Sequence, residues 1–278
     1  MIAARPLLVP MHPTLTTAPQ SPPPFAPALP PVRTAVHVVA ATEAQFEKYM
    51  GHFRPFLALG LSNYEEHQVC AVAIGVVGDI CRALEAKVLP YCDEIVHLLL
   101  RNLQNPNLNR NVKPPILSCF GDIALAVGGE FEKYMQITMS MLVQASSAPI
   151  DTTNNPDMVE YLNQLREGIF EAYTGVVQGL RADNKAAAFD PYLPCALDLV
   201  RQVAEGIPQG VPTDEVIRAA AGMVGDLGSA IAAARVTARQ PPHREYLKAL
   251  LKEATKNSPS DTTKQVGQWA HQEIFGKP

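Results

Sequence analysis

Downstream of residue 42, long segments with apolar residues at helical spacing alternate with short segments of turn-forming residues. Asn105-Pro106-Asn107 and Gly128-Gly129 are two such interruptions, and both favour the end of a helix. Pro114 and Pro115 suit the first turn of the next helix, where a missing N–H costs nothing. The pattern predicts paired helices over residues 46–61, 65–84, 91–103, 114–127, 135–144, 157–180, 192–204, 214–234, 244–255 and 262–275.

Short sequence markers recur along these predicted helices. The string FEKYM occurs at residues 46–50 and again, unchanged, at 131–135, an offset of 85 residues. A Gly-Asp pair between apolar residues occurs at Gly78-Asp79 and Gly121-Asp122, 43 residues apart, and returns at Gly225-Asp226. The offset of 85 residues therefore corresponds to two repeat units of about 43 residues each.

A tyrosine follows the same period in the first helix of each pair. Tyr49, Tyr91 and Tyr134 are 42 and 43 residues apart, and Tyr192 and Tyr246 continue the series at longer intervals. Repeats of about 40 to 47 residues built from two helices are typical of HEAT and armadillo arrays, in which each pair buries its apolar face against its neighbours. We therefore predict an all-α fold, an α-solenoid of about five HEAT-like helix pairs over residues 43–278.

The first 42 residues differ in composition from the rest of the chain. They hold ten of the 25 prolines, two basic residues and no acidic residue. A segment so rich in proline cannot form helices, and we interpret it as a disordered leader. A targeting sequence is the alternative, although transit peptides are amphipathic and rich in arginine.

Composition and charge argue against several function classes. Without the leader the chain has a net charge of −6, against −4 for the whole chain, which disfavours nucleic-acid binding. The common catalytic motifs and Cys/His clusters with metal-ligand spacing are absent from the sequence, so we expect neither an enzyme nor a bound cofactor. The most apolar stretch, residues 219–236, is interrupted by Asp226 and predicts no membrane anchor. Five cysteines without a CxxC pair indicate free thiols in a reducing compartment.

Acidic and amide side chains form a stripe on the predicted helix 157–180. Glu160, Gln164, Glu167 and Glu171 are spaced by 4, 3 and 4 residues, which places them on one face. A solvated helix face is one interpretation. A binding surface for a positive partner is the other, and the like charges at Glu167 and Glu171 give a weak reason to prefer it.

Aspartates recur at one repeat position, as Asp79, Asp122 and Asp226. Recurrence with the repeat favours a structural role, such as a bond to the neighbouring repeat, over contact with a ligand. The third pair departs from this pattern, because Gly179 stands where the aspartate is expected. The segment Asp157-Met158-Val159-Glu160 resembles a capping box at the start of the predicted helix 157–180.

Several of these segments resemble the C-terminal part of the importin beta family of nuclear import receptors, the karyopherins. The resemblance covers residues 46–274 and is less close over 181–212 and 256–268. The segments that carry it are 68–84 (QVCAVAIGVVGDICRAL), 90–103 (PYCDEIVHLLLRNL), 112–135 (VKPPILSCFGDIALAVGGEFEKYM), 161–180 (YLNQLREGIFEAYTGVVQGL), 220–231 (AAGMVGDLGSAI) and 268–274 (QWAHQEI).

The resemblance implies a HEAT superhelix whose second helices line a concave side. In the family, the C-terminal repeats wrap the basic N-terminal helix of importin alpha. Glu160, Glu167 and Glu171 become candidate contacts for that helix or for basic cargo, with Asp214 and Glu215 as weaker candidates. Trp269 matches a tryptophan of the family's final helix and could stack on a cation, or it could cap the end of the core.

The resemblance also sets expectations for other partners and for location. Family members are much longer, and the repeats that hold the main sites for Ran and for FG nucleoporins have no counterpart in this sequence. We therefore expect a fragment with at most weak contacts to both, located in the cytoplasm, the nucleus and the nuclear pore. The alternative is a structural HEAT scaffold in a multiprotein complex without a transport role.

Overall fold

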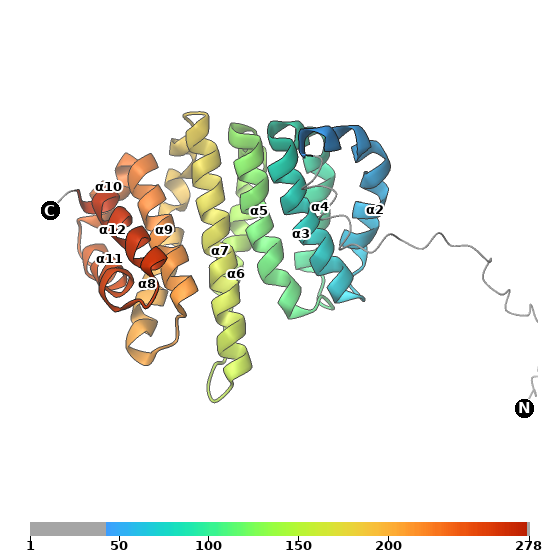
Figure 1. Cartoon of the computed structure of the whole chain (residues 1–278). Helices are drawn as coiled ribbons and strands as arrows, with labels where there is room; N and C mark the ends of the chain where they lie inside the picture. The colour runs from blue at the N-terminus through green and yellow to red at the C-terminus, as the bar shows by residue number, and fades with distance from the viewer. Residues whose placement is uncertain (1–42, 277–278) are drawn as a thin grey trace, which may run out of the picture. The chain divides into compact units, whose positions relative to one another are not determined.

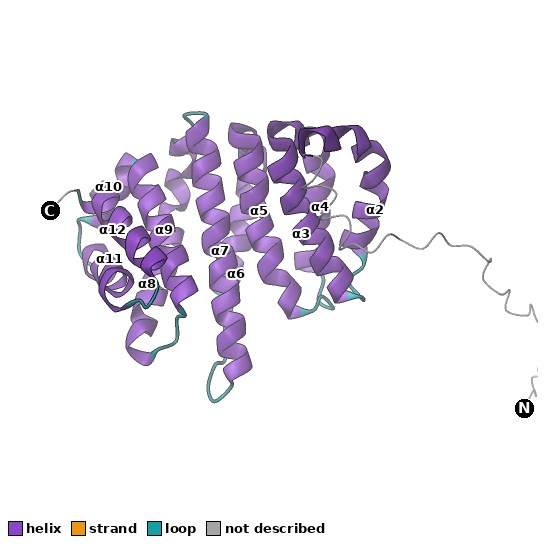
Figure 2. Ribbon diagram, in the orientation of Figure 1, coloured by secondary structure: helices purple, strands orange, loops and turns teal. Residues whose placement is uncertain are grey.

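The computed structural model describes residues 43–276, and all regular structure in that range is helical (Figures 1 and 2). The predicted all-α class is therefore confirmed. The interpretation of residues 1–42 as a disordered leader lies outside the described residues. The α-helices are α2 (Met50–Ser62), α3 (His67–Leu84), α4 (Leu89–Gln104), α5 (Lys113–Val127), α6 (Met135–Ser146), α7 (Pro156–Ala182), α8 (Leu193–Gly206), α9 (Asp214–Ala230), α10 (Ala232–Ala238), α11 (His243–Lys252) and α12 (Asp261–Phe275).

The helices form five successive pairs, as the repeat pattern predicts. The pairs are α2/α3, α4/α5, α6/α7, α8/α9 and α11/α12, with α10 as an extra short helix. The second helices α3, α5, α7 and α9 lie side by side in one layer, and α12 packs against α9 (Figure 1). Apolar side chains of both members of each pair join one continuous hydrophobic core. Stacking of neighbouring pairs therefore supplies the burial that a single pair lacks.

Glycines allow α5 and α7 to approach closely. A Cβ atom added at Gly175 would lie 2.3 Å from the carbonyl oxygen of Gly121, and one added at Gly179 would lie 2.2 Å from that of Ala124. Neither distance leaves room for a side chain, because the neighbouring atoms belong to helical backbone. This contact explains why Gly179 replaces the recurring aspartate in the third pair.

Two of the recurring aspartates contact the preceding repeat. Arg82 donates to Asp79 on its own helix (2.7 Å) and also to Asp122 on α5 (3.2 Å). Asp226 on α9 accepts a hydrogen bond from Gln178 on α7 (3.0 Å). The bonds at Asp122 and Asp226 therefore link adjacent second helices.

The prediction of one helix over residues 214–234 is wrong. The chain is extended at Ile231 (φ −123°, ψ 111°), and this residue separates α9 from α10. Gly228 packs against the backbone of α12 at Glu273, and Arg235 donates back to the Gly228 carbonyl oxygen.

No single helix in residues 43–276 is long and apolar enough to span a membrane. Taken together, α9 and α10 have the required length and hydropathy, but they are bent by 120° relative to each other.

The predicted capping box at the start of α7 is also wrong. Asn155, two residues upstream of Asp157, is the N-cap, and its side-chain oxygen accepts from the backbone N–H of Met158 (3.3 Å). Pro156 then occupies the first turn, where it needs no hydrogen-bond partner. Asp157 remains in the first turn, where a negative charge complements the helix dipole.

Candidate partner-binding grooves

The longest helix, α7, carries the predicted acidic stripe. Its 27 residues run from Pro156, which follows the Asn155 cap, to Ala182. The Gln164 side chain donates to the Glu160 carboxylate (3.1 Å) and so joins the stripe to its first glutamate. Glu160 and Glu171 are exposed at the surface, and Glu167 is half-buried.

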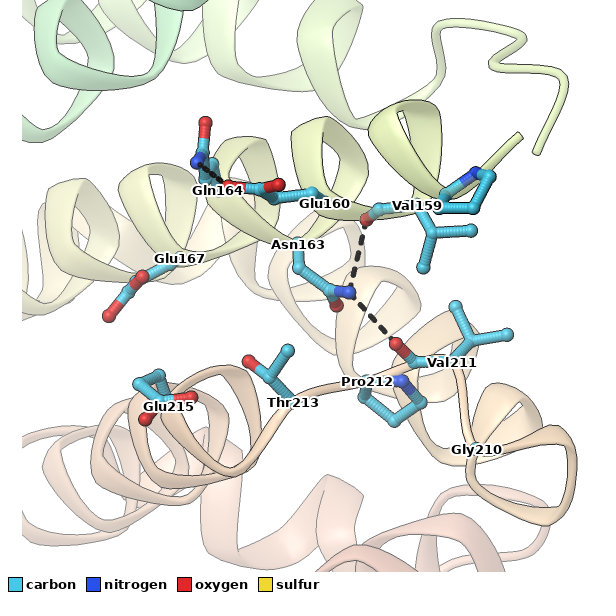
Figure 3. Close-up of a pocket in the computed structure, with 11 residues that line it drawn as sticks. Val159, Glu160, Asn163, Gln164, Glu167, Gly210, Val211, Pro212, Thr213 and Glu215 are labelled. Carbon is cyan, nitrogen blue, oxygen red and sulfur yellow. Dashed lines mark hydrogen bonds between the residues drawn. The ribbon is translucent and has the colours of Figure 1, made fainter.

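A groove of about 470 Å³ separates the first half of α7 from the start of α9 (Figure 3). Glu160 and Glu167 line it from α7, and Glu215 lines it from α9. Thr213 caps α9 by accepting from the Val216 N–H (3.4 Å), which fixes the backbone that presents Glu215. Carboxylates from two different repeats therefore share one groove.

Asn163 ties together the two walls of this groove. Its side-chain amide donates to the carbonyl oxygens of Val159 (3.1 Å) and Val211 (2.8 Å), as Figure 3 shows. The side chain is only 4% exposed. The bond to Val211 thus connects α7 to the loop before α9, while the bond to Val159 lies within α7.

A second groove of about 310 Å³ lies on the other side of the stripe, between α5 and α7. Glu171 lines it, and Gln164 and Glu167 line both grooves. Pro115 and Ser118 form part of its α5 wall. The stripe is therefore a ridge that separates two neighbouring grooves.

Desolvation and neighbouring carboxylates raise the pKa of two glutamates on this ridge. Partial burial raises the pKa of Glu167, and Glu215 adds to the effect while Arg218 opposes it. Although much of Glu171 is exposed, desolvation of its carboxylate in the groove between α5 and α7 raises its pKa to about 7, with further contributions from Glu167 and Asp122. Arg218 and the nearby Ser118 hydroxyl act in the opposite direction.

The carboxylates of the grooves form no salt bridge within the described residues. None of the nine ion pairs in residues 43–276 involves Glu160, Glu167, Glu171 or Glu215. Their mutual repulsion is therefore not cancelled by salt bridges within this range. An incoming cation would relieve it.

Asp214 differs from the other candidate residues in its contacts. Its two carboxylate oxygens accept hydrogen bonds from the hydroxyls of Ser258 (2.5 Å) and Thr263 (2.6 Å). Both partners belong to the last repeat, so Asp214 connects α9 to the start of α12. The neighbouring Glu215 has no such partner and faces the groove (Figure 3).

Trp269 lies on α12 and packs against α9. A Cβ atom added at Gly225 would lie 2.2 Å from the indole ring, so the absence of a side chain at Gly225 makes room for it. The tryptophan nevertheless remains 37% exposed. It thus covers part of α9 and still offers an aromatic surface to a partner.

Neither Asn163 nor Arg218 stands out in the sequence pattern. Arg218 lies three residues after Glu215, so helical spacing could have placed it on the same face of α9. The bond from Asn163 to Val211 spans 48 residues. Periodicity within one helix contains no signal for such a contact.

A family model described as "Importin subunit beta-1-like, TPR repeats" matches residues 32–255. Importin subunit beta-1 of Schizosaccharomyces pombe is 40% identical over 232 residues, which are 84% of this chain and 26% of the relative. The Arabidopsis thaliana importin subunit beta-1 is 42% identical over 84% of this chain and 26% of its own length. The chain therefore spans about a quarter of the length of these relatives.

Solved structures show the same likeness. A crystal structure of importin beta in an ammonium sulfate condition matches with a TM-score of 0.81 and 33% identity, over 88% of this chain and 28% of that one. A structure titled "Kap95:Nup1 complex" matches with a TM-score of 0.76 and 28% identity, over 87% of this chain and 28% of that chain. A complex of Kap95p with RanGDP matches equally well, with a TM-score of 0.76.

Proposed function

The chain belongs to the importin beta-1-like family, and from this premise we propose that it is the C-terminal HEAT-repeat part of a nuclear import receptor. Its acidic grooves bind the basic N-terminal helix of importin alpha, or basic cargo, for import into the nucleus. The observation that carries this proposal is the set of groove carboxylates without ion pairs, contributed by α7 and α9. The family is one of transport receptors rather than enzymes.

The shape and charge of the grooves support a basic, elongated partner. Glu160, Glu167 and Glu171 follow the axis of α7 over 11 residues, about 16 Å at the rise of an α-helix. A bound helix with arginine or lysine on successive turns would meet these carboxylates in register. Complementary charge of this kind accelerates encounter and fixes orientation.

Contacts with nucleoporins and with Ran are weaker parts of the proposal. The Kap95 relative is found in complex with Nup1, and Kap95p is found with RanGDP. We propose that this chain keeps at most weak contacts of both kinds, because it spans only 28% of those chains. Such a receptor would occur in the cytoplasm, the nucleus and the nuclear pore.

Calorimetric titration of the full chain with an Arg/Lys-rich peptide from the N-terminus of importin alpha tests the proposal. We expect binding at low salt that weakens steeply at high salt, because the contact is between exposed charges. The same peptide with its basic residues changed to glutamine is the control and should not bind. If a folded protein binds neither peptide, the import function fails and a structural scaffold becomes the better explanation.

Affinity for the basic peptide should rise with pH around neutrality. Glu171, with a pKa of about 7, is largely protonated at pH 6 and ionised at pH 8, and a bound cation favours the ionised form. The peptide should therefore bind up to about tenfold more tightly at pH 8 than at pH 6. Glu171→Gln should remove this dependence, and an unchanged pH profile in that variant would exclude Glu171 as its source.

A rise in pH has the opposite effect on the stability of the free protein: affinity for the peptide increases, whereas the contribution of Glu171 to stability decreases. Glu171 titrates at about 7 in the folded chain, above the ordinary value of 4.5. The folded state therefore holds this proton more tightly than the unfolded state does. Its contribution to stability is present below pH 4.5 and is lost as the pH rises toward 7.

Trp269→Ala distinguishes the two roles considered for this residue. If the indole stacks on a cation of the partner, peptide affinity should fall by about 2- to 30-fold, the equivalent of roughly 0.5 to 2 kcal/mol. If the indole only covers α9, the melting temperature should fall while affinity stays constant. Titration and thermal unfolding of the same variant separate these outcomes, and Trp269→Phe is a milder control.

A further inference from the structure

Basic side chains recur at every fourth residue along α11. Arg244, Lys248 and Lys252 lie on this helix, and Lys256 follows in the π turn Glu253–Asn257 that extends it. All four are exposed. Residues 244–256 hold these four basic residues and two acidic ones, a net charge of +2, whereas the whole chain has a net charge of −4. The positive charge is therefore a local feature of this helix.

Helical geometry places the four basic residues, which we call the basic stripe, along one line. In an α-helix, a side chain four residues further on lies almost directly above the first and is displaced by a small angle. A π turn takes more residues than an α turn, so a step of four residues across Glu253–Asn257 reverses this displacement. The stripe therefore stays aligned over 12 residues, about 18 Å at the rise of an α-helix.

Salt bridges and helix stability do not account for the basic stripe. None of its members takes part in the nine ion pairs of residues 43–276. Like charges four residues apart repel each other and weaken a helix. Lys252, in the last turn of α11, complements the helix dipole, but Arg244 lies in the first turn, where the dipole disfavours a positive charge. A negative partner outside the chain would explain the pattern.

The surroundings of the stripe suit a narrow partner better than a wide anionic surface. The apolar face of α11 is buried, with Leu247, Leu250 and Leu251 at most 1% exposed, so it is not free to insert into a membrane. The helix α8 packs beside α11 (Figure 1) and presents Asp198 and Glu205 at the surface. A membrane or a nucleic-acid duplex that covered both helices would meet these carboxylates.

We infer that the basic stripe is a docking site for an acidic helical segment of a partner protein, with aspartate or glutamate on successive turns. Such a segment, laid along α11, brings one carboxylate beside each basic side chain over the length of the stripe. Opposite charges in register fix the orientation of the partner and accelerate its encounter. The stripe lines neither of the grooves beside α7, so the chain has one surface for a basic partner and another for an acidic one.

The test measures binding of the full chain to a fluorescent alanine-based peptide with glutamate at every fourth position. We expect binding at low salt that weakens at high salt, and no binding of the same peptide with glutamine in place of glutamate. Lys248→Glu with Lys252→Glu should weaken binding by roughly 5- to 30-fold. Affinity for the basic importin-alpha peptide should not fall in this variant, which separates the stripe from the proposed import function.

A matched double variant changes the net charge equally at other sites. Lys48 and Arg101 are exposed and take part in no ion pair within the part of the chain that the structure describes. Arg101 lies in the last turn of α4, as Lys252 does in α11, so the loss of helix-dipole stabilisation is also matched. Lys48→Glu with Arg101→Glu should keep the affinity within about 2-fold.

Two further variants test alignment and guard against misfolding. A peptide of the same composition with its glutamates spread around the helix should bind several-fold less tightly. Lys248→Gln with Lys252→Gln should also weaken binding, and it keeps the test decisive if the charge reversal prevents folding, as circular dichroism would report.

Each outcome decides the inference. No binding by the folded, unmodified chain would overturn the docking site, and so would equal losses in the two charge-reversed variants or equal affinity for the aligned and the spread peptide. Tighter binding to phosphatidylserine-rich vesicles or to RNA than to the peptide would overturn the choice of an acidic helix. Self-association that disappears with Lys248→Glu and Lys252→Glu would make a second copy the partner and overturn a separate one.

Discussion

Gly179→Asp is expected to lower the free energy of unfolding by about 4 kcal/mol, even though it restores the aspartate of the repeat pattern. A Cβ atom at this position would lie 2.2 Å from the Ala124 carbonyl oxygen and 2.8 Å from its carbon. The helices α5 and α7 would have to move apart along their whole contact. The new carboxylate would also start from a buried backbone position, where loss of hydration disfavours a charge.

Gly75→Asp is the matched control for this prediction. Gly75 lies within α3, is exposed, and has no atom within 4 Å of an added Cβ. The same substitution there should change stability by no more than about 0.5 kcal/mol. Chemical denaturation measures both variants, and equal effects at Gly75 and Gly179 would contradict the close contact of α5 with α7.

The double charge reversal Glu167→Lys with Glu171→Lys is expected to weaken binding of the basic peptide by roughly 100-fold, about 2.7 kcal/mol. Both side chains line the groove between α5 and α7, and Glu167 also lines the groove toward α9. The reversal places two positive charges where the proposed ligand has its own. Repulsion between the two lysines replaces repulsion between the two glutamates, and the lysines gain attraction to Glu215 and Asp122 while they lose attraction to Arg218. The melting temperature should therefore change little.

A second double variant keeps the change in net charge and moves it away from the grooves. Glu130 and Glu245 are exposed and lie outside both grooves. Glu130→Lys with Glu245→Lys should retain most of the affinity at physiological salt, because long-range effects of exposed charges are screened there. If both double variants weaken binding equally, net charge rather than the acidic ridge attracts the peptide.

Close helix packing and surface charge are coupled in this protein. A Cβ atom at Gly121 would lie 2.6 Å from the Glu171 carbonyl oxygen, so the backbones of α5 and α7 touch at this level. The neighbouring Asp122 therefore lies near enough to raise the pKa of Glu171. Small residues inside the array thus bring carboxylates of two repeats together at its surface.

Local sequence patterns were sufficient to predict the helical class, the five pairs and the alignment of Glu160, Glu167 and Glu171 on one helix face. Those features follow from residue spacings within a helix or from the repeat period, and both can be read directly from the order of residues in the chain. The repeated markers also located the departure at Gly179, although not its cause.

Packing between repeats, which local patterns do not describe, accounts for the break at Ile231 and the partners of Asp214. The Asn155 cap in place of the predicted capping box was likewise visible only in the folded chain. That packing also brought Glu215 of α9 opposite Glu160 and Glu167 of α7, and it exposed Tyr49 while burying Tyr134 in an identical pentapeptide. The bonds of Asp214 reach residues 44 and 49 positions away. Such contacts depend on how neighbouring repeats stack, because packing between helices sets the distances between their residues, and a local sequence pattern does not specify those distances.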